Sequence, residues 1–151
     1  PDYPELLYDR AMAAGQIGKN DILEKDLRKL IQLKPGHAHA HNALGYSFAE
    51  NGNRLPEALK LIEKAIKLSP GDPYIIDSLG WVHYQMGNLD KGISYLKQAF
   101  QIKSDPEIAA HLGEALWMQG TKDDAKKVWR STIRDYPDNE VLLNIMKKFM
   151  P

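Results

Sequence analysis

The feature that most constrains this chain is an internal period of about 34 residues. A Leu-Gly pair recurs three times at this spacing, at 44–45, 79–80 and 112–113. A second series of glycines follows the same spacing, at Gly18, Gly52, Gly87 and Gly120. A third series consists of prolines after apolar stretches, at Pro35, Pro70 and Pro137, and Ser104 stands where a fourth would fall. A period of this length is typical of proteins built by stacking one supersecondary unit on the next.

Each unit predicts two helices, because its apolar residues recur three and four positions apart. We expect helix pairs at 4–17/21–33, 38–51/56–68, 73–86/89–103 and 106–119/122–135, and a single last helix at 140–149. No stretch of residues alternates in the manner of a β-strand. The Gly-Asn pairs at 52–53 and 87–88 are therefore predicted to be turns between helices.

The residues at the predicted boundaries agree with this helical interpretation. Asp72-Pro73 and Asp105-Pro106 each match an N-cap residue followed by a proline in the first turn. Pro56 also favours a helix start. Thr121-Lys122-Asp123-Asp124 resembles a capping box, with Asp in place of the usual Glu.

These series resemble the tetratricopeptide repeat (TPR), whose signature runs through Leu-Gly, an aromatic residue, Gly, Ala, a second aromatic residue, Ala and Pro. The second repeat carries most of it, as Leu44, Gly45, Phe48, Gly52, Ala58, Ile62, Ala65 and Pro70. The third repeat has Gly92 where alanine is usual, and the first has Arg10-Ala11 where Leu-Gly is expected. The resemblance covers almost the whole chain.

The resemblance implies an all-α fold, a right-handed solenoid of helical hairpins (a TPR superhelix). Four repeats are expected, at about 4–37, 38–72, 73–105 and 106–139, with a capping helix over 140–150. We expect a single domain spanning 1–151 that is a fragment of a longer protein, because the chain starts at Pro1-Asp2 without an initiator methionine. Degeneracy of the first repeat suggests that further repeats precede it.

Neighbouring hairpins in such a solenoid share a continuous core, which predicts which residues are structural. We expect the following side chains to be buried: Leu44, Phe48, Leu79, Leu112, Leu116 and Trp129. Small residues such as Gly45 let the helices approach closely. At the far end, Phe149 and Met150 of the last helix are expected to remain exposed for a partner.

Three histidines at alternate positions, His37, His39 and His41, raise the question of a metal site. Residues two apart on a helix point about 200° apart, so His39 and His41 cannot chelate one ion. The repeat pattern assigns His37 to the linker before the helix and turns His41 inward as a core residue. We therefore expect packing or solvent exposure and no metal ligation.

The resemblance implies that ligands bind the concave side of the solenoid, which the first helix of each pair lines. Carried over residue by residue, the candidate partner-binding positions are Tyr8, Met12, His39, Asn42, Tyr46, Tyr74, Asp77, Trp81, Tyr84, Glu114 and Trp117. Aromatic side chains with polar groups are the kind that interface hot spots favour. The alternative is that some of these rings only cover an adjacent helix.

Composition excludes several other classes of function. Lys+Arg and Asp+Glu number 20 each, so the net charge is zero, which argues against nucleic acid or an anionic membrane as the partner. The chain has no cysteine, no hydrolase elbow and no His-Glu-x-x-His motif. "AAGQIGKN" differs from a phosphate-binding loop at Ala13 and Asn20. We expect neither an enzyme nor a cofactor.

The sequence therefore predicts a non-catalytic adaptor or scaffold that binds a protein or peptide in a concave groove. No Lys or Arg occupies the groove positions, which argues against a clamp for a carboxylate tail and favours an apolar, mildly basic partner. The alternative is a structural segment that mediates self-assembly (a homo-oligomer) or completes a longer solenoid.

A finer resemblance concerns "HNALGYSFAENGNRLPEALKLIEKAI" and the repeats after it. They are similar to the carboxy-terminal repeats of large proteobacterial TPR proteins, some of them outer-membrane lipoprotein adaptors. That similarity implies the bacterial periplasm or envelope, a protease or its substrates as partner, and no direct membrane contact from this segment.

Overall fold

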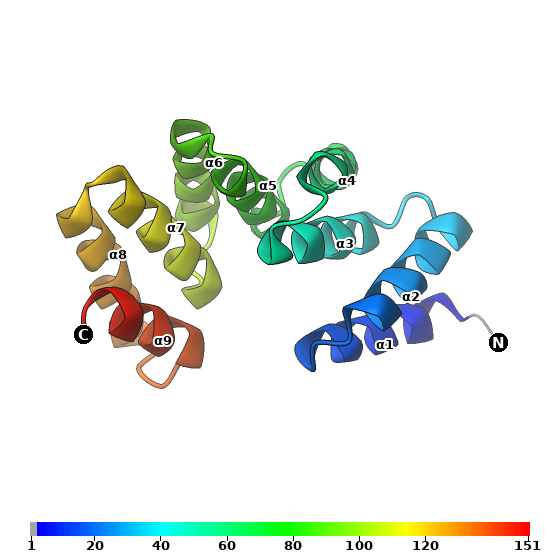
Figure 1. Ribbon diagram of the computed structural model, residues 1–151, viewed down its shortest axis with the longest axis horizontal. Helices are drawn as coiled ribbons and strands as arrows, with labels where there is room; N and C mark the ends of the chain where they lie inside the picture. Colours follow the sequence, from blue (N-terminus) through cyan, green and yellow to red (C-terminus); the bar gives the residue numbers. More distant parts are fainter. Residues whose placement is uncertain (1–2) are drawn as a thin grey trace. The chain divides into compact units, whose positions relative to one another are not determined.

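Within residues 3–151, which the computed structural model describes, the chain forms nine α-helices and no β-strand (Figure 1). The helices are α1 (Pro4–Gln16), α2 (Asn20–Leu33), α3 (Ala38–Asn51), α4 (Leu55–Leu68), α5 (Pro73–Gln85), α6 (Leu89–Ile102), α7 (Pro106–Gln119), α8 (Lys122–Asp135) and α9 (Glu140–Phe149). Each predicted boundary lies within one residue of the observed one. The predicted all-α fold of helical hairpins is confirmed.

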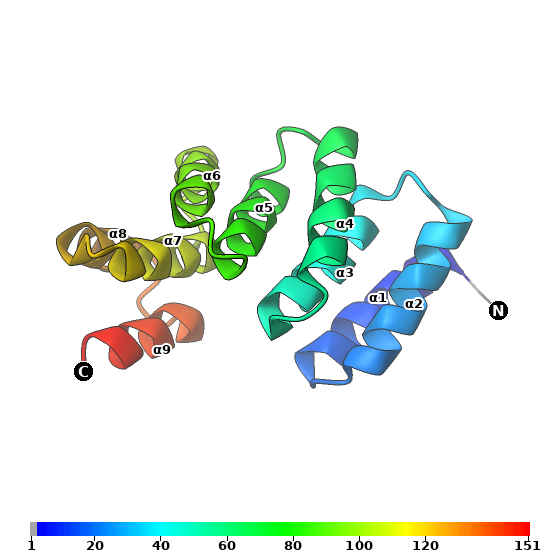
Figure 2. The ribbon, with the colours of Figure 1, turned by 45° about the horizontal axis from the view of Figure 1, so that its top comes forward.

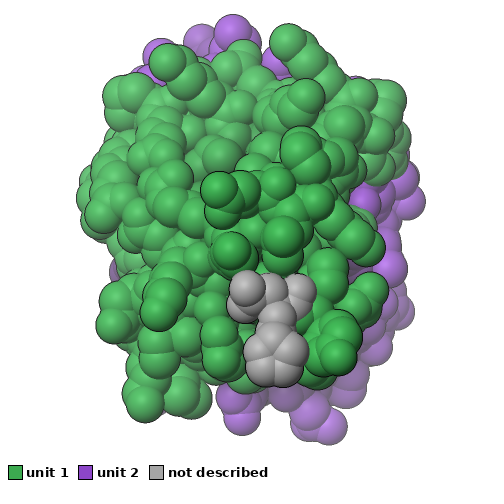
Figure 3. Space-filling view, turned by 90° about the vertical axis from the view of Figure 1, so that its right-hand side faces the viewer, with its two compact units in different colours: residues 1–71 green, residues 72–151 purple. Residues whose placement is uncertain are grey.

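The helices pack as hairpins within two compact units, Pro1–Gly71 and Asp72–Pro151. In unit 1, α1 packs against α2 and α3 against α4, and α2 also contacts α3. In unit 2, the hairpins are α5–α6 and α7–α8, and α9 lies against α7 and α8 (Figure 2). Figure 3 colours the two units separately. The single solenoid domain spanning 1–151 stays a prediction.

The helix boundaries follow the predicted chemistry at most places. Asp72 and Asp105 accept hydrogen bonds from the first free amides of α5 and α7, as predicted. Gly52 ends α3 with a φ of 69°, a left-handed conformation that favours glycine. The capping box at Thr121 is wrong: its hydroxyl donates to the Leu116 carbonyl at 2.9 Å, so it satisfies the end of α7 and does not cap α8.

Glycines allow the paired helices to approach closely. A Cβ at Gly45 of α3 would lie 2.9 Å from the Ala58 carbonyl oxygen of α4. A Cβ at Gly92 of α6 would lie 2.9 Å from the Gly80 carbonyl oxygen of α5. Glycine therefore replaces the usual alanine of the third repeat because the backbones of α5 and α6 are in contact at that point.

The predicted structural residues are all buried, none exposing more than 6% of its surface. The core of unit 2 gathers around Trp129 of α8, which is fully buried and stacks on Phe149 of α9 at 5.7 Å between ring centroids. The expectation that Phe149 and Met150 stay exposed is wrong. Both are partly buried against this core, because the amphipathic α9 turns them toward α7 and α8.

In the degenerate first repeat, an ion pair takes the place of the usual apolar contact. The Arg10 guanidinium of α1 donates to both carboxylate oxygens of Asp26 in α2, at 2.6 and 2.8 Å. The Asp26 side chain is 3% exposed, so this charge is buried and depends on its partner. Arg10 therefore joins α1 to α2 at the position where leucine is expected.

The histidines of 37–41 lie where the repeat pattern places them. His37 is the N-cap of α3, and its Nδ1 accepts a hydrogen bond from the Ala40 amide at 3.0 Å. His41 is buried, and its Nε2 donates to the Pro35 carbonyl at 2.8 Å. His39 is exposed. Among residues 3–151, no group of three or more His, Asp or Glu side chains is placed to hold a metal ion.

Candidate functional site

The candidate residues of unit 2 lie on α5 and α7, whose starts are set by two similar caps. The Asp72 carboxylate accepts from the Tyr74 amide at 2.8 Å, and the Asp105 carboxylate accepts from the Glu107 amide at 2.9 Å. Each cap sets where its helix begins, and therefore which residues face the neighbouring helix. The helices α5 and α7 are in contact, so their candidate residues can lie next to each other.

A hydrogen-bonded histidine–carboxylate pair joins the two helices. His111 of α7 donates from Nδ1 to both carboxylate oxygens of Asp77 in α5, at 2.9 and 3.0 Å. The side chains of His111 and Asp77 are 14% and 8% exposed. A carboxylate this deeply buried is tolerated because it has a hydrogen-bonded partner.

An aromatic stack covers this pair. The Trp81 ring lies 4.1 Å from the ring of His111 and 4.8 Å from that of Tyr84, nearly parallel to both. Trp81 is 8% exposed, so most of its surface contributes to packing. Its indole Nε1 is buried and has no hydrogen-bond partner among the residues that the structure describes. The stack holds the three rings in fixed orientations.

Tyr84 extends the cluster to a second acidic side chain on α7. Its hydroxyl interacts with the Glu114 carboxylate. Burial, and next the negative charge of Glu114, raise the pKa of the Tyr84 hydroxyl. Tyr84 and Glu114 are both half-buried and therefore accessible from solvent. We name Asp77, Trp81, Tyr84, His111 and Glu114 the α5–α7 cluster.

Two other candidate residues of unit 2, Tyr74 and Trp117, make their contacts with residues outside this cluster. Tyr74 is 38% exposed, and its hydroxyl donates to Asp105 at 3.3 Å, next to the Lys103 ammonium. Trp117 packs on Trp129 and Phe149, and the ammonium groups of Lys122 and Lys126 lie 5.1 and 5.8 Å from its ring. The Trp117 ring thus belongs to the packing of α7 with α8 and α9.

The candidates of unit 1 lie on α1 and α3. The Tyr8 ring of α1 is 5.4 Å from that of His37, which in turn meets the His39 ring edge-on at 6.5 Å. Burial raises the pKa of the Tyr8 hydroxyl, and the nearby Asp9 charge adds to it. Met12, Asn42 and Tyr46 are half-buried, and the Asn42 side-chain oxygen is buried without a hydrogen-bond partner in the described chain.

Comparison with known families decides what kind of protein carries these sites. Three models described as tetratricopeptide repeat match residues 8–73, 75–106 and 111–139. The chain belongs to the tetratricopeptide-repeat family. TPR proteins generally mediate protein–protein interactions.

Similar TPR proteins occur in bacteria and eukaryotes. A TPR repeat-containing protein of Pseudomonas aeruginosa is 50% identical over 117 residues, which cover 74% of this chain and 20% of that protein. The small glutamine-rich tetratricopeptide repeat-containing protein 2 of Mycosarcoma maydis is 30% identical over 79% of this chain and 32% of its own length. The TPR chain thus spans less than two thirds of either relative.

Solved structures show the same fold. A thermophilic TPR protein of Thermus thermophilus superposes with a TM-score of 0.87 and 21% identity, covering 99% of this chain and 82% of that chain. An O-GlcNAc transferase of Thermobaculum terrenum matches with a TM-score of 0.80 and 24% identity over 88% of this chain and 26% of its own.

In residues 3–151 no helix combines the length and the apolar character that crossing a bilayer requires.

His111 is the member of the α5–α7 cluster that sequence reasoning missed. His111 lies one residue after Ala110, which is the position that the family pattern assigns to the groove. The pattern therefore did not select His111 as a candidate. Its separation from Asp77 is 34 residues, one repeat period. The signal in the sequence is that Asp77 and His111 are an acidic residue and a histidine one repeat period apart, both on first helices. That spacing is compatible with a contact between two consecutive repeats.

Proposed function

We propose that this TPR segment is a non-catalytic interaction module, an adaptor or scaffold, that binds a peptide or protein segment at the α5–α7 cluster. The observation that carries the proposal is the convergence of Trp81, Tyr84 and Glu114 from the first helices of two consecutive repeats. These helices hold the groove positions of the family. The candidate residues of unit 1, on α1 and α3, are proposed as further contacts.

The cluster offers a partner both apolar area and polar groups. The exposed parts of Tyr84 and Glu114 provide an aromatic ring and a carboxylate acceptor. Aromatic side chains with a polar group are enriched at binding hot spots.

The cluster is held in place before any partner arrives. Stacking fixes the Trp81 and Tyr84 rings, and the His111–Asp77 pair fixes the spacing of the helices beneath them. Side chains that are already ordered lose little conformational entropy on binding. Since Asp77 is paired and Glu114 is an acceptor, the site favours a segment with apolar side chains and hydrogen-bond donors.

Selection from a displayed peptide library on the purified chain tests this proposal. We expect selected peptides to lose affinity by about tenfold on the double change Trp81→Phe/Glu114→Gln, because a charged hydrogen bond is worth about 1.5–3 kcal/mol. Glu114→Gln keeps side-chain shape and Trp81→Phe keeps an aromatic ring in the stack, so the helix content measured by circular dichroism should be unchanged. The matched control is Glu63→Gln on the exposed face of α4. Equal affinity for the double variant and the wild type would refute the site.

Self-assembly is a second candidate function, favoured by exposed apolar side chains at the edges of the units. On α1, Leu6 is 60% exposed and borders a hollow lined also by Leu7, Asp9 and Arg10. On α9, Val141 and Leu143 are 43% and 44% exposed. Light scattering over a range of concentrations separates the two functions, because a concentration-dependent dimer supports self-assembly and a monomer that binds peptide excludes it.

The identity of the partner rests on the resemblance alone. A periplasmic protease, or one of its substrates, is the partner to test first, by adding the purified protein to the wild-type chain and to the Trp81→Phe/Glu114→Gln variant. Capture by the wild type and loss with the variant would support it.

A further inference from the structure

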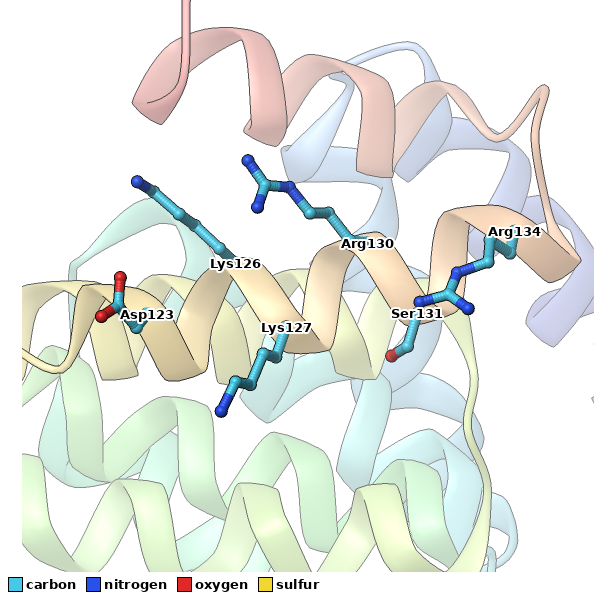
Figure 4. Close-up of a pocket in the computed structure, with 6 residues that line it drawn as sticks. All are labelled: Asp123, Lys126, Lys127, Arg130, Ser131 and Arg134. Atoms are coloured by element: carbon cyan, nitrogen blue, oxygen red, sulfur yellow. The ribbon is translucent and has the colours of Figure 1, made fainter.

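The outward face of α8 carries a row of cations around a hollow of about 440 Å³ (Figure 4). Lys126, Lys127, Arg130 and Arg134 line the hollow, together with Asp123 and Ser131. Figure 4 shows the Lys126 and Arg130 side chains on one side of the helix and Lys127 on the other. Lys126, Arg130 and Arg134 follow each other at four-residue intervals, so they are neighbours on the helix surface.

Three of these cations form no ion pair with a carboxylate of the described chain. In the part of the chain that the structure describes, no ion pair joins Lys127, Arg130 or Arg134 to a carboxylate. Two arginines of unit 1 contrast with them, since Arg28 pairs with Glu24 and Glu57, and Arg54 pairs with Glu24. Like charges four residues apart destabilise a helix, so the row on α8 has a cost that an anionic partner would remove.

An apolar hollow lies next to this row. It measures about 440 Å³ and is bordered by α6, α7 and α8. The half-buried Phe100 and Val128 contribute apolar surface, and the charged side chains that line the hollow are Lys97, Lys127 and Asp124. Lys127 lines both hollows, so they form one continuous surface with an apolar part and a cationic part. The charged side chains of this surface lie on α6 and α8, the second helices of their hairpins, whereas the α5–α7 cluster lies on first helices.

We propose that this α6–α8 surface is a second docking site of unit 2, and that its occupant is an acidic peptide segment carrying an apolar side chain. The carboxylates would lie along Lys126, Lys127, Arg130 and Arg134, and the apolar side chain would enter the hollow beside Phe100. A partner of this charge differs from the one that the acidic α5–α7 cluster favours. The TPR segment would therefore hold two different partners, or two parts of one, which is how a scaffold works.

The test is fluorescence anisotropy with the full chain and a labelled peptide rich in Asp and Glu around one central leucine. Raising the salt from about 0.01 M to 0.15 M should weaken binding, because the screening length falls from about 30 to 8 Å. Replacing the leucine of the peptide by serine should weaken binding about tenfold, because the apolar side chain that would be buried in the hollow is lost. The double change Lys127→Glu/Arg130→Glu should cost at least about tenfold, because it places like charges opposite each other.

The matched control is Lys60→Glu/Lys64→Glu, which reverses two exposed lysines four residues apart on α4. Lys127 and Arg130 are exposed as well, so both double variants should keep the wild-type circular dichroism. Equal loss of affinity in both variants would overturn the proposal, since it would show an effect of net charge alone. The proposal would also be overturned if the peptide did not bind detectably, or if duplex DNA bound as tightly as the peptide.

Discussion

Replacing Gly92 by alanine should destabilise the protein, although alanine is the usual residue of the repeat at this position. The added Cβ would lie 2.9 Å from the Gly80 carbonyl oxygen, 3.0 Å from the Tyr84 amide nitrogen and 3.3 Å from the Tyr84 Cα. All three are backbone atoms of α5, and none can rotate away. The helices α5 and α6 must therefore separate by a few tenths of an ångström.

The magnitude follows from two opposing effects. Alanine in a helix interior is favoured over glycine by about 1 kcal/mol. Adding a methyl group to a closely packed contact costs about 1–3 kcal/mol, and rigid backbone neighbours place this site in the upper part of that range. The net loss should be about 1–2 kcal/mol, and each kcal/mol lowers the melting temperature by about 2–4 °C in a protein of this size.

Thermal and urea unfolding, followed by far-ultraviolet circular dichroism, measure this loss. The control is Gly15→Ala in α1, where the Cβ would meet only the Leu23 Cδ1 at 2.7 Å, the end of a side chain that can rotate. Gly15→Ala should leave stability unchanged or raise it by up to about 1 kcal/mol. A Gly92→Ala protein as stable as the wild type would refute the argument that backbone contact decides this position.

The remaining predictions concern the core, the α3 cap and the α5–α7 cluster. Trp129→Ala should cost about 3–5 kcal/mol in urea unfolding, because it removes the ring at the centre of the unit 2 core, and a loss below about 1 kcal/mol would contradict that assignment. Burial is the main cause that lowers the pKa of His37, and the charges of His39, Lys34 and His41 add to it against a backbone hydrogen bond that raises it. The stabilising effect of His37 is therefore complete above the ordinary histidine pKa and is lost as pH falls through the lowered one. The melting temperature of His37→Asn, which keeps a capping side chain, should therefore fall less on acidification than that of the wild type, and parallel curves would disagree. Because the pKa of Tyr84 is raised, the wild type and Tyr84→Phe should show the same absorbance change of tyrosine ionisation up to pH values around 10, and a smaller change in the variant would contradict the burial of this hydroxyl.

The helices could be predicted from the sequence because the information they need is local. Apolar spacing, the Asp-Pro caps and the glycine turns each act within a few residues, and the predicted bounds lie within one residue of the observed ones. The capping role predicted for Thr121 is the exception. A hydroxyl beside two helix ends can satisfy either, and the geometry of the turn chose the end of α7.

The candidate site was predictable in part. The repeat pattern placed Asp77, Trp81, Tyr84 and Glu114 on two first helices, and the structure brings them together. It could not show that Trp81 is 8% exposed, or that Trp117 packs with Trp129 and Phe149. Both facts depend on which neighbour covers each ring, and the neighbours His111, Trp129 and Phe149 lie one or two helices further along the chain.

By itself, the sequence determined that this is a TPR protein, where its helices begin and end, and which side chains are structural. These follow from a period of about 34 residues and from contacts between nearby residues. Only the tertiary structure decided that His111 hydrogen-bonds to Asp77 and that Gly92 must lack a side chain. It also decided that Lys127, Arg130 and Arg134 form no ion pair within the described chain. Each of these depends on distances between residues of different helices, and a few tenths of an ångström between packed backbones lie beyond what spacing along the chain can specify.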